Sequence, residues 1–292
     1  MSNRGFTEGI IFTKGFDTTS RKTISRHTAR GKLVKLAPQA YIPATAWYSA
    51  TALQKLSIRA AAHQLTTPGS VITGAAAAQL HGITVDHLVD HTRIDIAVDQ
   101  KSRRKPRHGV VFHRLTHHLL TTSRLHQVHN ATVRVADPAP AVVDIARFHG
   151  TVPGLVATEH AWHNRKVTQT GLLAAASEIG RCAGSRRARH TVDFAGPWSE
   201  SPRESELKLR LHREGFPPPV QQARIFDSLG GFVARPDFFF PEVGLIIEYE
   251  GAQKTEGPLA GLTAVRELER VRAFDNLGLV VRHVDAIDFR SQ

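Results

Sequence analysis

Arg235-Pro-Asp-Phe-Phe-Phe-Pro-Glu-Val-Gly-Leu-Ile-Ile-Glu-Tyr-Glu-Gly251 is the stretch that decides the fold of this 292-residue chain. Residues 236–240 are aromatic and typical of a strand, and residues 245–249 combine aliphatic, β-branched and aromatic side chains. Residues 241–244 between them carry the proline and glycine of a tight connection. The stretch therefore predicts two neighbouring strands joined by a short turn.

The second strand carries an unusual pair of carboxylates. Because side chains alternate across a strand, Glu248 and Glu250 share one face with Ile246 and lie about 7 Å apart. The opposite face then carries Leu245, Ile247 and Tyr249. If Asp237 pairs opposite the two glutamates, we expect three carboxylates to converge.

Converging carboxylates repel each other, at roughly 4 kcal/mol for two unit charges about 4 Å apart and an effective dielectric of about 20. A proton or a cation relieves this repulsion. Oxygen ligands on a rigid strand suit Mg²⁺ or Mn²⁺, and such an ion can activate water for attack on a phosphodiester. The pattern favours a metal site formed by Asp237, Glu248 and Glu250. A plainer interpretation, a solvated pair of charges on an edge strand, stays open.

Short motifs around this stretch resemble a known family. Pro236-Asp237 followed by Glu248-Tyr-Glu-Gly-Ala-Gln-Lys254 is similar to the PD-(D/E)XK signature of nucleases, and more closely to a domain family related to very-short-patch-repair endonucleases. Ser201-Pro-Arg-Glu204-Ser205 resembles the opening of that domain. The segment that closes the family's domain is similar to three parts of this chain, Glu267, Arg270 and Leu277–Arg282. The resemblance spans about residues 200–290 and implies an α/β core of the restriction-endonuclease type.

The same resemblance implies roles for individual residues. Asp237 and Glu248 would bind the metal, Glu250 would act as a further ligand or take the place of the family lysine, and Glu204 would complete the site. Lys254 would contact phosphate. The sequence departs from the family at two positions, because Glu250 stands where the family has aspartate and Lys254 where it has histidine. A lysine is a poor general base unless its pKa falls.

The charges are unevenly distributed along the chain. Residues 1–200 hold 26 Lys and Arg against 12 Asp and Glu, a balance of +14, and residues 201–292 hold 12 against 14, a balance of −2. A basic half favours binding to a polyanion, although solubility alone also explains a basic surface. The single cysteine excludes a disulfide framework or a cysteine zinc site. With no long apolar run, we expect a cytoplasmic protein with no membrane contact.

The first 45 residues predict a winged helix-turn-helix. A first helix is expected within residues 6–16, and a capping sequence at 17–20 precedes a basic helix over 21–30. Residues 32–42 alternate around a turn and predict a two-stranded wing. The segment resembles the N-terminal domain of AbiEi-type antitoxins, which implies double-stranded DNA and a cognate toxin as partners. A solvated basic helix or a protein-binding module is the alternative. Candidate DNA contacts are Arg21, Lys22, Ser25, Arg26, Arg30, Lys32 and Lys35.

Residues 46–195 predict a mixed α/β middle region similar to the same family. Strands at 93–98 and 109–114 are expected to form a hairpin with Arg103, Arg104 and Lys105 at its tip. That tip would grip a phosphate backbone or remain a solvated loop. Asp144 lies on a helix of small apolar residues, which indicates a packing role. The composition of residues 195–202 indicates a domain boundary.

The sequence thus predicts a two-part α+β and α/β protein: a winged helix-turn-helix (1–45), an AbiEi-like middle region (46–195) and a PD-(D/E)XK domain (200–292). The first hypothesis is a DNA-binding protein with a metal-dependent endonuclease domain. The second is a non-catalytic AbiEi-type antitoxin or transcriptional regulator whose tail is a degenerate nuclease fold.

Overall fold

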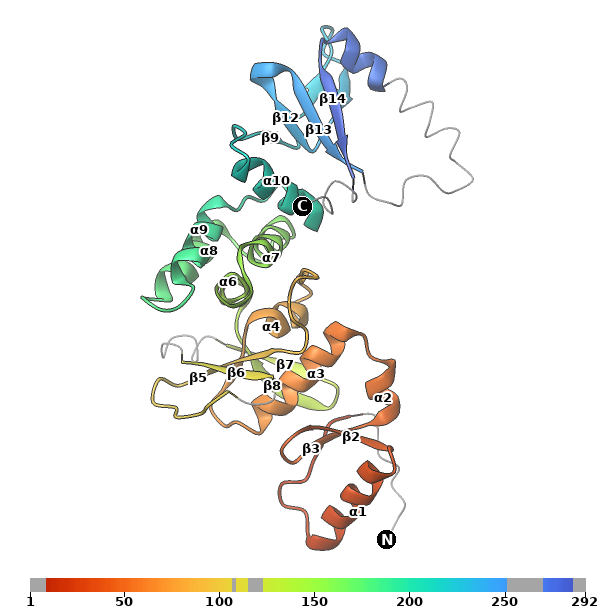
Figure 1. The fold of residues 1–292 in the computed structure, drawn as a ribbon, viewed down its shortest axis with the longest axis vertical. Coiled ribbons are helices and arrows are strands. Elements are labelled where there is room, and N and C mark those ends of the chain that lie inside the picture. The colour runs from red at the N-terminus through yellow and green to blue at the C-terminus, as the bar shows by residue number, and fades with distance from the viewer. Residues whose placement is uncertain (1–8, 107–108, 115–122, 251–269, 286–292) are drawn as a thin grey trace. The chain divides into compact units, whose positions relative to one another are not determined.

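A computed structural model of the chain describes residues 9–106, 109–114, 123–250 and 270–285 (Figure 1). The chain divides into two compact units, Met1–Ala195 and Gly196–Gln292. The described residues form several sheets and a larger number of helices. The expected mixed α/β class is therefore confirmed, and the predicted regions 1–45 and 46–195 lie in one compact unit that shares one hydrophobic core.

The helices and strands of the first unit alternate along the chain. In chain order they are β1 (Ile11–Phe12), α1 (Thr18–Ala29), β2 (Leu33–Ala37), β3 (Ala40–Pro43), α2 (Ala44–Ser49), α3 (Ala52–Leu65), β4 (Val71–Ile72), α4 (Gly74–Leu80), β5 (Ile94–Val98), β6 (Val110–Arg114), β7 (Arg124–Val128), β8 (Ala131–Val135), α6 (Pro138–His149), α7 (Thr151–His163), α8 (Gln169–Glu178) and α9 (Ser185–Phe194).

The start of this unit is a three-stranded sheet of order β1-β3-β2 with α1 beside it. Asp17 caps α1 by accepting a hydrogen bond from the Ser20 amide at 2.6 Å, and Ile24 is the buried residue of the helix. The basic helix and the two-stranded hairpin of the sequence prediction are both confirmed. The helix expected within 6–16 is wrong for the described residues 9–16, which contain β1.

The larger sheet of the unit has the order β6-β5-β4-β8-β7. Helix α3 contacts strands of both sheets and so joins them (Figure 1). It begins with a capping box in which Thr51 and Gln54 bond to each other's amides. Strands β5 and β6 pair in parallel, with Ile94 opposite Val110, so the expected hairpin is wrong. Both strands exist, but they run in the same direction instead of being joined by a tight turn.

Four helices, α6 to α9, pack against one another beyond the sheet (Figure 1). Helices α6 and α7 approach each other closely, since a Cβ on Gly154 would lie 2.4 Å from Ala146 Cβ. Helix α6 begins at a proline and is apolar along much of its length, which explains its place in the middle of the group. Gly184, in a left-handed backbone conformation, is the N-cap of α9.

The second unit has its own sheet and core. Its described elements are α10 (Pro202–Arg213), β9 (Val220–Gln221), β10 (Ile225–Phe226), β11 (Phe232–Ala234), β12 (Phe238–Phe240), the 3₁₀ turn η1 (Pro241–Val243), β13 (Leu245–Tyr249), a helical segment at 270–276 and β14 (Val280–Val284). The sheet order is β14-β13-β12-β9, with β13 antiparallel to β12 and parallel to β14.

The predicted alternation along β13 is confirmed by the two apolar clusters on either side of the sheet. Ile247 packs with Phe238, Phe240 and residues of α10, whereas Ile246 packs with Phe274 of the helical segment. Strands β10 and β11 form a separate two-stranded hairpin. Gln222 adopts a left-handed backbone conformation with φ of 54°, at the break between β9 and β10.

Candidate functional site

Two of the predicted carboxylates, Glu204 and Asp237, are bridged by one amide group. Gln222 Nε2 donates to Glu204 Oε2 at 3.2 Å and to Asp237 Oδ1 at 3.3 Å. Ser201 caps α10 at the amide of Glu204, and Glu204 Oε2 accepts from the Glu200 amide at 2.9 Å. The first turn of α10 thus fixes Glu204 in place, and Gln222 brings Asp237 next to it.

The pair is electrostatically strained. Burial raises the pKa of the Glu204 carboxyl, and the nearby charge of Asp237 raises it further, while the hydrogen bond from the Glu200 amide opposes the shift. Asp237 Oδ2 accepts from the Tyr249 amide at 2.9 Å, which fixes this side chain beside the end of β13. This bridged pair is called the Glu204–Asp237 pair below.

Glu248 lies on β13 with Arg270 as its principal partner. Arg270 Nη1 and Nη2 donate to Glu248 Oε1 and Oε2 at 3.0 and 2.7 Å. Such a two-bond guanidinium–carboxylate pair is strong and geometrically specific. Both oxygens that would bind a metal therefore point at a cation already supplied by the chain, and that cation comes from the helical segment 270–276.

Glu250 is held from β14. His283 Nδ1 lies 2.9 Å from Glu250 Oε1 and 4.0 Å from Glu248 Oε2. Since His283 is opposite Glu248 in the parallel β13–β14 register, the sheet itself brings this imidazole to the two glutamates. Glu250 is the most solvent-exposed of the four carboxylates described. Lys254 and Glu267 lie outside the described residues.

The four carboxylates thus divide into the Glu204–Asp237 pair and a second group in which Arg270 and His283 hold Glu248 and Glu250. Within the described ranges, no three His, Cys, Asp or Glu side chains are placed to hold a metal ion. The residues as arranged do not fit Mg²⁺ or Mn²⁺, because Arg270 occupies both oxygens of Glu248. A metal at Asp237, Glu248 and Glu250 stays a prediction that requires Arg270 to withdraw.

The predicted DNA-contacting residues of the first unit are all exposed. Residues four positions apart are neighbours on a helix surface, so Arg21 lies beside Ser25 and Lys22 beside Arg26 on the exposed side of α1. Helix α1 contains no acidic residue, and Asp17 is its cap. The other three predicted DNA contacts lie just after α1 and at the start of the β2–β3 hairpin, and they are Arg30, Lys32 and Lys35. We call these seven residues the basic face.

Arg103, Arg104 and Lys105 are also exposed, although they do not lie at the tip of a hairpin. They belong to the connection between the parallel strands β5 and β6. Arg104 lies 6.0 Å from the ring centre of Phe112, a contact that leaves its charge in solvent. Their exposure is compatible with either the phosphate-gripping or the solvated interpretation.

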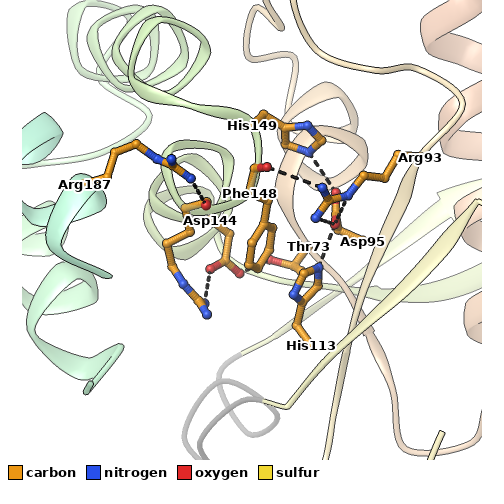
Figure 2. A network of polar contacts seen from close by, with 9 residues as sticks. Thr73, Arg93, Asp95, His113, Asp144, Phe148, His149 and Arg187 are labelled. Atoms are coloured by element: carbon orange, nitrogen blue, oxygen red, sulfur yellow. Dashed lines mark hydrogen bonds and ion pairs between the residues drawn. The ribbon is translucent and has the colours of Figure 1, made fainter. Parts of the chain in front are cut away.

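A buried polar network lies between the large sheet and α6 (Figure 2). The Asp95 carboxylate of β5 is nearly inaccessible and accepts from His113 Nε2 at 2.6 Å, from His149 Nε2 at 2.8 Å and from Arg93 Nε at 3.0 Å. Burial raises the pKa of Asp95, but the two imidazoles more than reverse this effect and hold the pKa well below its usual value. Phe148 stacks on His113 with ring centres 3.5 Å apart.

Asp144 on α6 lies beside this network, and its environment supports the predicted packing role. It accepts from Thr73 Oγ1 at 2.6 Å and from Arg147 Nη1 at 2.7 Å. Complete burial raises the pKa of Asp144, and Arg147 opposes the shift. Arg147 also donates to the exposed Cys182 at 3.1 Å, and Arg187 bonds to carbonyl groups near the end of α6. Arg187 of α9 thus ties this helix to α6.

Sequence reasoning missed several of these residues. Gln222 and His283 lie outside the motifs, and only the sheet register and the turn at Gln222 place them beside carboxylates. Asp95, His113 and His149 are far apart in the sequence, and His113 is on a strand whose pairing was predicted wrongly. No local signal marks such a cluster.

The fold and site define a mixed α/β protein of two compact units with a basic N-terminal face and a carboxylate-bearing C-terminal sheet. No family model matches the chain. It is 27% identical over 250 residues to the uncharacterized protein Rv2248 of Mycobacterium tuberculosis H37Rv and, equally, to MT2308 of strain CDC 1551, which covers 84% of this chain and 86% of each relative. This degree of similarity indicates distant homology to these mycobacterial proteins.

Among solved structures, the crystal structure of the RV2827C protein from Mycobacterium tuberculosis is similar to this chain. The match has a TM-score of 0.41 and 15% sequence identity, and covers 75% of this chain and 84% of that chain. At that TM-score the likeness carries no argument about site or function. Within the described part of the chain, no helix has the length and apolar character needed to cross a membrane.

Proposed function

We propose that this chain is a regulator that binds double-stranded DNA through its basic face and does not cleave it. The observation that carries the DNA-binding proposal is the acid-free, exposed side of α1 followed by the β2–β3 hairpin. Helix followed by hairpin is the order in which a winged helix-turn-helix inserts a helix into the major groove and touches the backbone with its wing. Each phosphate neutralised by the basic face releases counterions, so binding falls steeply as salt rises.

We further propose that the second unit is a nuclease-like fold without activity, and its topology supports this. An initial helix, antiparallel strands, the central β13 and a helical segment leading to the parallel β14 follow the order expected of a PD-(D/E)XK core. In this arrangement the Arg270–Glu248 pair takes the place that a metal would need. That pair, with Glu250 and Lys254 at the two positions where the family differs, supports a fold that no longer hydrolyses DNA.

A second candidate function, a metal-dependent endonuclease, is favoured by one observation. The Glu204–Asp237 pair brings two carboxylates to one amide group, and the pKa of Glu204 is raised by burial and by its neighbour. A carboxyl group with a raised pKa beside a second carboxylate is a feature of catalytic sites, although structural networks produce one too. A cognate toxin remains a further prediction of the regulator hypothesis.

DNA binding is tested by fluorescence anisotropy with duplex fragments, including the region upstream of the gene, at several salt concentrations. The double variant Arg21→Glu, Arg26→Glu should weaken binding and reduce the salt slope by about 0.9 per lost phosphate contact. Arg213→Glu, at an exposed arginine of α10, is a charge-reversal control outside the basic face and should leave the slope unchanged. Equal binding by the double variant and the control would remove the basic face from the interface.

Hydrolysis is tested separately with supercoiled plasmid and Mg²⁺ or Mn²⁺. We expect no nicking by the wild-type protein or by Asp237→Ala. Nicking by the wild type that disappears in Asp237→Ala would overturn the non-cleaving proposal in favour of the endonuclease. Arg270→Ala distinguishes a third case, because nicking only in this variant would identify the Arg270–Glu248 pair as the feature that suppresses hydrolysis.

A further inference from the structure

The β10–β11 hairpin presents apolar side chains to solvent at its tip. Leu229 is 94% exposed, Phe232 is 56% exposed and Phe226 is 45% exposed. Phe226 and Phe232 are directly opposite each other in the strand register, and their rings meet edge to face with centres 5.9 Å apart. Side chains this apolar are seldom left in water as a group without a partner.

The turn of the hairpin is closed by hydrogen bonds to the side chain of its own first residue. Asp227 Oδ1 accepts from the Leu229 amide at 2.9 Å and from the Gly231 amide at 2.7 Å, so the turn is fixed by its own first residue. A Cβ on Gly231 would lie 2.5 Å from the Asp227 carboxylate, which explains the glycine. The inward side of the hairpin is anchored, because Ile225 and Ala234 belong to the apolar cluster of Ile246 and Phe274.

The outward side carries a cation. The Arg224 guanidinium lies 5.3 Å from the ring centre of Phe226 and 5.6 Å from that of Phe232, over both rings. A guanidinium stacked on aromatic rings keeps its charge available to a phosphate, and aromatic and aliphatic side chains beside it suit the faces of bases. This combination complements nucleic acid better than it complements an apolar protein surface.

The hairpin is also close along the chain to residues of the Glu204–Asp237 pair and to Gln222, which bridges them. Strand β10 begins shortly after Gln222, and β11 ends shortly before Asp237. At about 3.3 Å per residue, the chain from Gln222 to Leu229 spans at most roughly 25 Å, which is less than the about 34 Å of one DNA helical turn. A duplex held by the tip therefore lies within reach of the carboxylate-bearing end of the sheet.

We propose that the β10–β11 hairpin is a second DNA contact, in which Leu229 inserts between base pairs of a duplex while Arg224 contacts the adjoining phosphate. The inference rests on the proposed DNA binding and adds to it a contact from the other unit. Leucine and phenylalanine wedges of this kind partly unstack one base step and bend the duplex. Phe226 and Phe232 support the wedge from its outward side.

The test uses the full chain and short duplexes in which 2-aminopurine, whose fluorescence rises on unstacking, is scanned through every position. We expect wild-type protein to raise the fluorescence at one step and Leu229→Ser to abolish the rise, with affinity about fivefold to a hundredfold lower. Because serine changes no charge, the salt slope should stay unchanged. Val243→Ser, at a 70% exposed apolar residue of η1, is the matched control and should behave as the wild type.

The failures of the two proposals are distinguishable. A wild-type protein that binds no duplex at all overturns the proposed function together with this inference. A wild-type protein that binds duplex without a fluorescence rise, and with the same affinity as Leu229→Ser, overturns the wedge alone. If sedimentation then shows that the wild type self-associates and Leu229→Ser does not, the hairpin is a contact between copies of this chain instead.

Discussion

Replacing Asp95 with asparagine should destabilise the first unit strongly. The carboxylate is nearly inaccessible and accepts three hydrogen bonds, two of them from the imidazoles of His113 and His149. A hydrogen bond to a charged group contributes about 1.5–3 kcal/mol, and removing one partner of a buried ion pair costs about 3–5 kcal/mol. The amide keeps one acceptor oxygen but turns a donor toward one imidazole. We therefore expect a loss of about 3 kcal/mol.

The expected loss depends on pH in a defined direction. The pKa of Asp95 in the folded protein lies below the unfolded value of about 3.9. Its ionised form therefore stabilises the fold above about pH 4, and this contribution is lost as the pH falls through the folded pKa. The difference in stability between wild type and Asp95→Asn should shrink as the pH is lowered from 7 toward 3.

Hydrogen exchange across a urea series, read by mass spectrometry on peptides from β5 and α6, measures this loss within the first unit alone. Asp193→Asn, at an exposed position of α9, is the control and should stay within about 0.5 kcal/mol of wild type. Equal protection of wild type and Asp95→Asn at pH 7 would refute the reasoning. A difference that stays constant down to pH 3 would refute the assignment of the depressed pKa to Asp95.

Three further substitutions test other parts of the fold. Gly154→Ala should destabilise the first unit by about 1–3 kcal/mol in urea unfolding, because its Cβ would overlap Ala146 across the α6–α7 contact; a neutral result would show that the two helices are not this close. Thr51→Ala should cost about 1 kcal/mol by removing the α3 capping box, with Thr45→Ala, exposed on α2, as its control. Glu204→Gln keeps an oxygen that accepts a hydrogen bond but removes a carboxyl group whose pKa is raised on folding. The urea midpoint of the variant should therefore rise relative to that of the wild type as the pH increases from 4 to 7. A relative rise on acidification instead would contradict the raised pKa.

The fold of the second unit was largely predictable from the sequence because its signals are local. The alternation along Leu245–Tyr249 predicted the two faces of β13, and both apolar clusters follow it. The turn at 241–244 was marked by its proline and by Gly244, whose φ of 59° suits glycine. The capping sequence before α1 predicted that helix in the same way.

The parts that failed depend on contacts between distant segments. Nothing within residues 93–114 reveals that β6 runs parallel to β5, because alternation is the same in either direction. Likewise, Glu248 reads as a metal ligand in the sequence, and only the fold brings the Arg270 guanidinium onto both of its oxygens. Charge pairing between a strand and a distant helical segment cannot be read from the strand alone.

The parallel pairing of β5 and β6 has a consequence for the order in which the chain folds. Strands β7 and β8 are joined by His129 and Asn130 alone, so they can close from a tight turn within microseconds. Strands β5 and β6 share no such turn, because the connection between two parallel strands must return along the length of the pair. We expect β5–β6 to be among the late steps of assembly, after β5 has found β4, and a time course of amide protection should therefore record β8 before β6.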